Sequence, residues 1–168
     1  RIGLIGFSKG GTEACLAAAS DPRIGVVVPC IGVQSFDWGL KNNAWQGRIK
    51  TIQPAFDAVT QTGGATNATV AAVKDFYDRV VPGIYGKFDG PAMLALIAPR
   101  PLLVINSDKD PNTPLPGVME SAEAARQAYR AKNAGDRFVL RIQANTGHQV
   151  RPASERAAIE WFVKWLEP

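Results

Sequence analysis

Four short apolar runs divide the chain and predict the strands of one sheet. They cover residues 2–6, 24–29, 102–106 and 138–142. The β-branched run at 24–29 is typical of a strand that is buried on both faces. Residues 12–20, 117–131 and 153–166 instead carry apolar side chains at helical spacing. Strands that alternate with helices over short connections form parallel units, so the sequence predicts an α/β fold with a parallel sheet and flanking helices.

The second and third apolar runs are separated by about 65 residues, which is too many for a bare loop inside a compact domain. This segment is rich in aromatic residues, and its parts 45–59 and 70–81 have helical spacing on either side of a polar connector at 60–69. We therefore predict a helical insertion at 36–96 within a domain that takes up residues 1–168. The insertion suits a lid or the wall of a substrate pocket. Its aromatic side chains could also simply pack it onto the sheet, and at single positions packing is the better interpretation.

Composition narrows the possible functions of the chain. Its 168 residues, 46% of them hydrophobic and 20% charged, fit one globular domain. The net charge of +4 comes from scattered Lys and Arg without a basic stripe, which argues against a nucleic-acid partner. No apolar stretch approaches the roughly 18 residues of a membrane span, so we expect no membrane partner. Cys15 and Cys30 lack metal-ligand spacing and are expected to be buried free thiols.

The first apolar run leads into Gly6-Phe7-Ser8-Lys9-Gly10 and then into a predicted helix. Strand, sharp turn and helix form the context of a G-x-S-x-G nucleophile elbow, which presents a serine hydroxyl above the sheet. We expect side chains at Gly6 and Gly10 to collide with the bent backbone, and Ser8 to hold a strained conformation. The alternative is an ordinary strand-to-helix turn in which Ser8 only caps the helix.

Two further polar residues stand at places equivalent to Ser8. Asp110 follows the third predicted strand, and His148, the only histidine of the chain, follows the fourth. Because the carboxyl ends of parallel strands face the same way, the three side chains can converge. A serine needs a base to take its proton, histidine is poised near neutral pH for that role, and a carboxylate orients the imidazole. Asp108 is the other candidate acid. We favour Asp110, in the turn before Pro111, and expect Asp108 to hydrogen-bond the turn backbone.

These residues and their order resemble the α/β-hydrolase superfamily. The resemblance covers the whole chain as the carboxyl-terminal half of that fold. More narrowly, the chain is similar to bacterial and plant hydrolases related to dienelactone hydrolases and acetyl xylan esterases. The stretches that carry this similarity are Phe36-Asp-Trp38, Asn43-Ala-Trp-Gln46, Phe88-Asp89 and Ile97-Ala-Pro-Arg-Pro-Leu102. The resemblance implies hydrolysis of a small-molecule ester, with no metal and no organic cofactor.

The chain also departs from that family. The resemblance implies four more strands before the elbow, and a loop that supplies one amide of the oxyanion hole. The remaining amide would be that of Lys9, the residue after the nucleophile. Losing one such donor typically costs about 100- to 1000-fold in turnover. The first strand would also leave an apolar edge uncovered. We therefore expect this chain to be part of a longer polypeptide, with the amino-terminal half present as a second chain or lost.

Three functions follow as hypotheses. The first is a serine esterase that forms an acyl-enzyme on Ser8, with His148 as base and Asp110 orienting it. The second is a serine peptidase of the prolyl oligopeptidase type, which uses the same half of the fold. The third is a non-catalytic fragment that serves as a binding or assembly module. The incomplete fold favours the third hypothesis, whereas the intact order of serine, aspartate and histidine argues against it.

Overall fold

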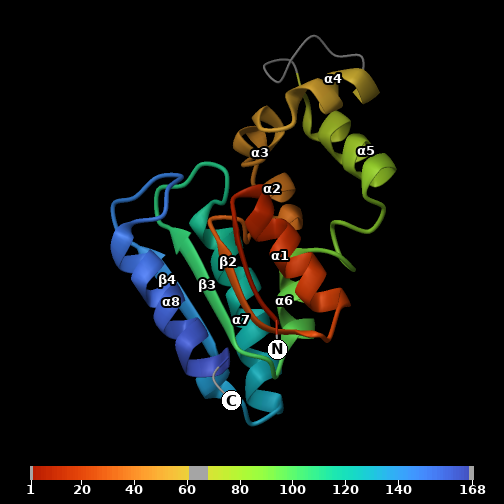
Figure 1. The fold of residues 1–168 in the computed structure, drawn as a ribbon. Coiled ribbons are helices and arrows are strands. Elements are labelled where there is room, and N and C mark those ends of the chain that lie inside the picture. The colour runs from red at the N-terminus through yellow and green to blue at the C-terminus, as the bar shows by residue number, and fades with distance from the viewer. Residues whose placement is uncertain (1, 61–67, 167–168) are drawn as a thin grey trace.

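A parallel sheet of four strands forms the centre of the computed structural model, which describes residues 2–60 and 68–166. The strands are β1 (Ile2–Phe7), β2 (Ile24–Cys30), β3 (Leu102–Ser107) and β4 (Phe138–Gln143), in the spatial order β1-β2-β3-β4. Every neighbouring pair is parallel, and the arrangement can be followed in Figure 1. The predicted α/β fold is confirmed, and each strand extends slightly beyond its apolar run.

Helices cover both faces of this sheet. One face packs on α1 (Lys9–Ser20), α6 (Gly90–Ile97) and α7 (Leu115–Ala131), and the other on α8 (Pro152–Leu166). Alternation along β2 shows the two layers, because Val27 belongs to the core under α1, α6 and α7, whereas Val26 and Val28 face α8. Both cores bury nearly all of β2 and β3, as the apolar runs predicted. Among residues 2–60 and 68–166, no helix is long and apolar enough to cross a membrane.

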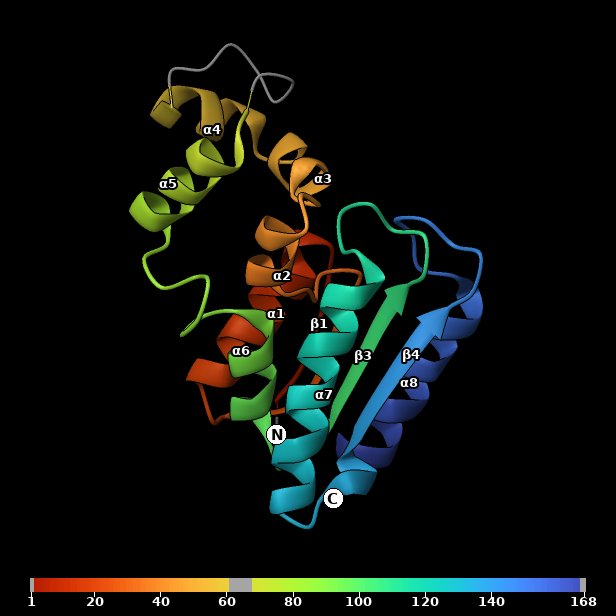
Figure 2. The same cartoon turned by 180° about the vertical axis from the view of Figure 1, so that it is seen from behind.

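The segment between β2 and β3 is helical and lies at the end of the sheet where the strands finish, as Figures 1 and 2 show from opposite sides. It contains α2 (Phe36–Lys41), α3 (Gln46–Lys50), α4 (Gln53–Thr60) and α5 (Val70–Val80) before reaching α6. A separate apolar core holds it together, formed by Trp45, Ile49, Phe56, Val73, Phe76, Tyr77 and Ile84. The packing interpretation therefore holds for most of its aromatic residues.

The single helix expected at 45–59 is wrong, because α3 and α4 are separate. Pro54 explains the break, since a proline inside a continuous helix lacks the N–H and collides with the preceding turn. Most of the connector expected at 60–69 lies outside the described residues. A short 3-10 helix, η2 (Gly135–Arg137), precedes β4.

Arg100 stabilises the end of the sheet at which the strands begin. Its guanidinium donates to the carbonyl oxygens of Ala18 (2.6 Å), Asp21 (3.0 Å) and Ile24 (2.8 Å). These acceptors lie at the carboxyl end of α1 and the start of β2, where helix carbonyls lack partners within the helix. The helix that follows the elbow is thus anchored at its far end.

Candidate active site

Ser8 occupies a strained turn between β1 and α1. Its backbone angles are φ 56° and ψ −116°, in a region that residues other than glycine seldom adopt. A hydrogen bond from its N–H to the carbonyl oxygen of Cys30 (2.9 Å) fixes the turn against the end of β2. The next residue of that strand end, Ile31, also has a positive φ, 46°. Two residues from different strand ends, Ser8 and Ile31, therefore hold costly backbone conformations at the same place in the fold.

The two glycines of the elbow differ in what they allow. A Cβ at Gly6 would lie 1.9 Å from the carbonyl oxygen of Gly10, so no side chain fits there. A Cβ at Gly10 would meet nothing within 4 Å. The expected collision is confirmed for Gly6 and wrong for Gly10, because the bend brings the backbone toward the first glycine only.

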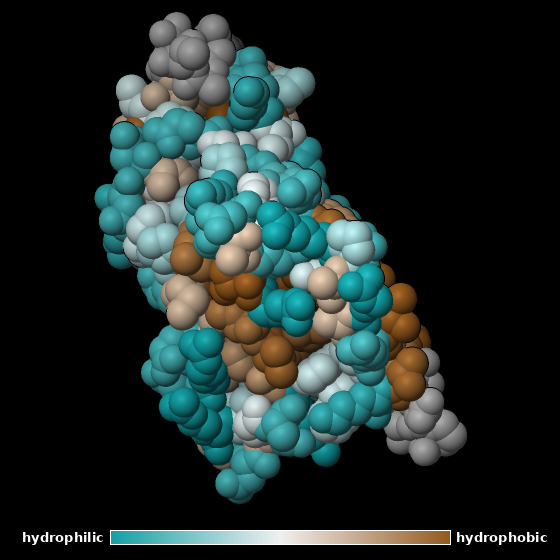
Figure 3. Space-filling view, turned by 90° about the vertical axis from the view of Figure 1, so that its left-hand side faces the viewer, coloured by the Kyte–Doolittle hydropathy of each residue, from teal (hydrophilic) through white to brown (hydrophobic). Residues whose placement is uncertain are grey.

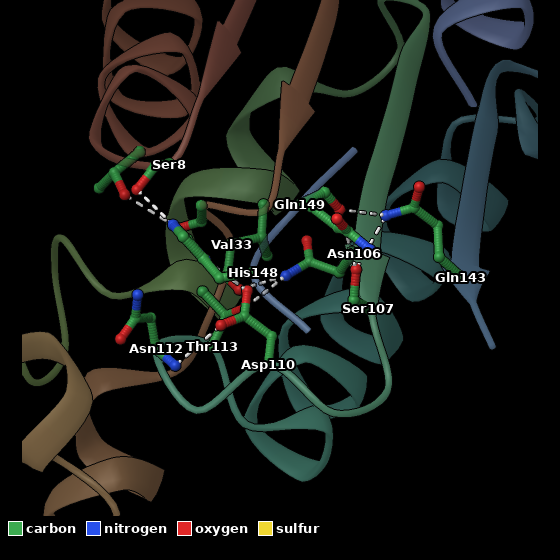
Figure 4. Close-up of polar contacts among 12 residues, drawn as sticks. Ser8, Val33, Asn106, Ser107, Asp110, Asn112, Thr113, Gln143, His148 and Gln149 are labelled. Carbon is green, nitrogen blue, oxygen red and sulfur yellow. Dashed lines mark hydrogen bonds and ion pairs between the residues drawn. The ribbon is translucent and has the colours of Figure 1, made fainter. Parts of the chain in front are cut away.

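Hydrogen bonds join the three residues that the sequence singled out. His148 Nε2 lies 2.8 Å from Ser8 Oγ, and His148 Nδ1 lies 2.8 Å from Asp110 Oδ2 (Figure 4). The Asp110 side chain is fully buried and that of His148 is 27% exposed. An ionised carboxylate can only accept, so Nδ1 carries the proton and Nε2 presents its lone pair to the serine hydroxyl. This arrangement is the one a general base for Ser8 requires.

Asp110 is held by a network that the sequence analysis did not identify. Its Oδ1 accepts from the N–H of Asn112 (2.9 Å), and its Oδ2 accepts from the hydroxyl of Thr113 (2.8 Å) as well as from His148. The Asn106 amide donates in turn to Thr113 Oγ1 (3.0 Å), and Figure 4 shows these side chains grouped behind the imidazole. The polar residues two and three positions after Asp110 were the available signal, because an aspartate often bonds the backbone two residues on.

Asp108 has a different place from the one expected. Its carboxylate accepts from the N–H groups of Asn145 (2.9 Å) and Thr146 (3.0 Å), in the loop that carries His148. These backbone hydrogen bonds hold the pKa of Asp108 below its ordinary value. The expected bonding within its own turn is thus corrected to a tie between two loops. We call residues 108–114 the acid loop and residues 144–151 the histidine loop.

Gln143 fixes the base of the histidine loop. From the end of β4, its Nε2 donates to Ser107 Oγ (2.8 Å) and to the carbonyl oxygen of Gln149 (2.9 Å). Its Oε1 accepts from the N–H of Arg151 (2.7 Å). The carboxyl end of the loop is therefore bonded to a buried amide at the loop's start, which limits the movement of His148.

Lys9 contributes to this region in two ways. It is the first residue of α1, where the N–H groups have no acceptor within the helix and the helix dipole favours negative charge. Its backbone N–H therefore stands beside Ser8 as a candidate donor to an oxyanion. Its side chain was not assigned a role from the sequence, and Nζ donates to the carbonyl oxygen of Thr51 (2.6 Å) at the end of α3.

The two cysteines are buried free thiols, as predicted. Burial raises the pKa of Cys15 to about 12, with a smaller contribution from Cys30, and burial likewise raises the pKa of Cys30 to about 12. A thiol that stays protonated at neutral pH is a poor nucleophile. Neither cysteine therefore competes with Ser8 as a candidate nucleophile.

Comparison with known proteins supports the fold. No sequence profile of a known family matches the chain. A Bacillus subtilis (strain 168) protein named "Putative hydrolase YtaP" is 27% identical over 166 residues, which cover 99% of this chain and 46% of that protein.

Solved structures give the same picture. Methylesterase BT1017 superposes with a TM-score of 0.62 at 17% identity, over 98% of this chain and 29% of its own. The catalytic domain of a glucuronoyl esterase from Hypocrea jecorina gives 0.61 at 21%, over 98% and 44%. An acetyl xylan esterase from Paenibacillus sp. R4 gives 0.52 at 16%, over 95% and 44%.

These likenesses confirm the predicted α/β-hydrolase fold. This chain spans less than half of each of the four proteins.

Proposed function

We propose that this chain carries the nucleophile, base and acid of a serine esterase. The observation that carries the proposal is the continuous hydrogen-bonded series from Ser8 Oγ through His148 to Asp110, with 2.8 Å at each step. The strained backbone of Ser8 supports it, since such strain collects at functional sites. The esterases among the structural neighbours support the hydrolysis of a carboxylic ester as the reaction class.

The proposed reaction proceeds through an acyl-enzyme. His148 Nε2 takes the proton of Ser8 as Oγ bonds to the ester carbonyl carbon, and Asp110 stabilises the imidazolium that forms. The N–H of Lys9 donates to the negative carbonyl oxygen. His148 then gives the proton to the departing alcohol, which breaks the ester bond. A water molecule, deprotonated by His148, finally releases the acid and restores Ser8.

Labelling of Ser8 with a fluorophosphonate tests the nucleophile. We expect the wild-type protein to be labelled, and Ser8→Ala to remain unlabelled although it folds. Cys30→Ala is a matched control, because it removes the buried thiol next to the elbow and leaves the proposed triad intact. A complete, folded protein in which Ser8 takes up no label would contradict the proposal and favour a non-catalytic module.

A substrate panel separates ester from amide hydrolysis. p-Nitrophenyl acyl esters and dipeptide amides are compared for kcat/KM under the same conditions. We expect turnover of the esters. Faster hydrolysis of the amides would favour the serine peptidase instead.

The helices between β2 and β3 are proposed to form a lid or pocket wall. They lie over the end of the sheet where Ser8, Asp110 and His148 meet, which supports this role (Figure 2). Their aromatic core makes the segment a folded unit rather than a loose loop. Substitutions on its surface that alter substrate preference without altering fluorophosphonate labelling would support the assignment, and unchanged preference across the acyl series would contradict it.

The open edge of β1 is proposed to receive the amino-terminal half of an α/β-hydrolase sheet, within one polypeptide or from a second chain. Ile2, Ile5 and Phe7 are each at least 40% exposed on this strand. A hollow of about 320 Å³ beside it is lined mainly by apolar side chains, among them Ile5 and Phe7 of β1 and Ala158, Ile159 and Phe162 of α8. Figure 3, which looks onto the α8 side, shows hydrophobic atoms at the surface with hydrophilic ones around them. A strand here would cover an edge prone to aggregation, and its loop could supply the second oxyanion donor.

The intact mass of the natural protein tests this proposal. We expect either a mass well above that of this chain or a second polypeptide that co-purifies with it. A natural protein with the mass of this chain alone and no companion would contradict the proposal.

A further inference from the structure

Helix α3 touches both of the loops that present the nucleophile and the acid. At its carboxyl end, the Thr51 carbonyl oxygen accepts from Lys9 in the elbow. Near its amino end, a Cβ on Gly47 would lie 2.5 Å from the carbonyl oxygen of Pro111 and 2.7 Å from Asn112 Oδ1. Only glycine allows so close an approach. Figure 2 shows α3 beside the turn that joins β3 to α7, so this helix of the insertion forms a bridge between the two loops.

Arg48 extends the contact from α3 toward the carboxylate of Asp110. With the Gln34 amide oriented to satisfy both of its neighbours, Oε1 accepts from Arg48 Nε (3.2 Å) and Nε2 donates to the carbonyl oxygen of Asn112 (2.8 Å). The N–H of the same Asn112 donates to Asp110 Oδ1 (2.9 Å). A buried arginine is thereby linked to the proposed acid through one side chain and one turn.

The charge of Arg48 has no ion-pair partner among residues 2–60 and 68–166. The side chain is only 7% exposed, and its Nη2 is buried without a hydrogen bond to any described residue. Burial lowers its pKa, while Tyr77 and then Asp110 act in the opposite direction. Phe36 provides a ring face 5.9 Å away, which offsets only part of the desolvation. Burying a charge without an ion-pair partner is costly, so a purely apolar side chain would pack this position at lower cost.

We propose that Arg48 is a positioning residue for the catalytic acid: through Gln34 it fixes the Asn112 carbonyl, and so the turn that aims the Asp110 carboxylate at His148. Gly47 allows this by letting α3 press against the acid loop. The insertion is then part of the catalytic apparatus as well as a cover for it. The inference rests on the proposed function, but its central claim concerns the geometry between Asp110 and His148.

Two measurements test it, and one of them does not need catalysis. Because His148 is the only histidine, the low-field NMR resonance of its Nδ1 proton reports the bond to Asp110 without ambiguity. The rate of fluorophosphonate labelling reports the reactivity of Ser8. We expect Arg48→Met to move the resonance upfield or broaden it, and to slow labelling by about 10- to 100-fold, since small misplacements of a catalytic group have effects of this size. Arg48→Lys keeps a charged donor and should fall between Met and the wild type.

Gly47→Ala provides a second route to the same result. Alanine favours a helix over glycine, so a loss of reactivity would come from the collision of the new Cβ with the acid loop and not from a weaker helix. The matched control is Gly39→Ala in α2, where a Cβ would meet only an ordinary contact at 3.7 Å. Lys109→Met removes an exposed charge from the acid loop itself and controls for charge alone. Both control variants are expected to keep the wild-type resonance and labelling rate.

The possible outcomes are distinct. If folded Arg48→Met and Gly47→Ala both keep the wild-type resonance, the inference is wrong, whether or not the protein is an enzyme. If the wild-type protein shows the resonance but takes up no label, the proposed esterase fails, while the effect of Arg48 on the resonance still decides the positioning role. Should Arg48→Met not fold, Gln34→Met breaks the same connection with the arginine in place, and an unchanged resonance there overturns the inference.

Discussion

Asp110→Asn gives the sharpest test of the proposed triad, because the surroundings of this side chain dictate what an amide must do. Asp110 Oδ1 faces one donor, the N–H of Asn112, and Oδ2 faces two, Thr113 and His148. If the new NH₂ group lies at the Oδ1 position, a buried backbone N–H loses its partner, at a cost of about 1–3 kcal/mol. If it lies at the Oδ2 position, His148 must accept at Nδ1 and carry its proton on Nε2.

The second orientation is expected to dominate, because the imidazole can change tautomer and the Thr113 hydroxyl can rotate, whereas the backbone N–H of Asn112 cannot turn away. This orientation removes the base. An Nε2 that already bears a proton cannot take one from Ser8, so only the minor orientation reacts. Its population carries the same cost of about 1–3 kcal/mol, and the lost charge-assisted bond to the imidazolium adds about 1.5–3 kcal/mol. Together these amount to a fall in kcat of roughly two to four orders of magnitude. KM should change little, because Asp110 is buried behind the imidazole.

The assay combines kcat for a p-nitrophenyl ester with the ¹⁵N shifts of His148, which report its tautomer directly. Asp108→Asn is the control, since that carboxylate contacts backbone N–H groups of the histidine loop and not the imidazole. Its loss should be smaller by about tenfold or more. A folded Asp110→Asn protein with kcat within about tenfold of the wild type and an unchanged tautomer would refute the assignment of Asp110 as the acid.

Three further outcomes follow from the structure. The pKa of Asp108 is lowered in the folded protein, so its hydrogen bonds to the histidine loop are complete at neutral pH and are lost as the pH falls through that lowered value. Limited proteolysis of the loop should therefore accelerate only at acid pH, and equal rates at every pH would contradict this. Burial raises the pKa values of Cys15 and Cys30, so iodoacetamide at pH 8 should modify both thiols only after unfolding, and rapid reaction of the native protein would disprove their burial. Arg100→Met removes four bonds to backbone carbonyls, those of Ala18, Asp21, Ile24 and Ile97, and should lower the free energy of unfolding in urea by about 4 kcal/mol. Arg23→Met, an exposed control, should change the midpoint little.

The elements that bury apolar residues could be predicted from the sequence, because a strand buried on both faces is a continuous apolar run and a helix has apolar residues at helical spacing. The runs that became β2 and β3 are buried on both faces, and the stripe from Val70 to Val80 became α5. The division between α3 and α4 was missed although Pro54 marked it, because apolar residues continue at helical spacing on both sides of the break. The convergence of Ser8, Asp110 and His148 followed from topology alone.

The parts of the site that were missed are polar contacts between residues far apart in the chain. Gln143 meets Ser107 across 36 positions, and Lys9 meets Thr51 across 42. Such pairs leave no periodicity, and a single polar residue at the end of a strand is indistinguishable from a solvated one before the fold is known. Gly47 illustrates the same limit, because a glycine within a helix reads as a weak helix former until the Pro111 carbonyl is found beside it.

The left-handed backbone at Ser8 has an evolutionary consequence. Its strain costs the fold about 1–3 kcal/mol, and glycine would adopt a φ of 56° freely. We expect Ser8→Gly to unfold at a higher urea concentration. Its free energy of unfolding should be larger by ~1 kcal/mol, after subtraction of the entropy that glycine adds to the unfolded chain. A lineage released from catalysis would thus gain stability from a change of this serine to glycine. In the proposed enzyme, this position would exchange stability of the fold for a serine hydroxyl held where the imidazole can reach it.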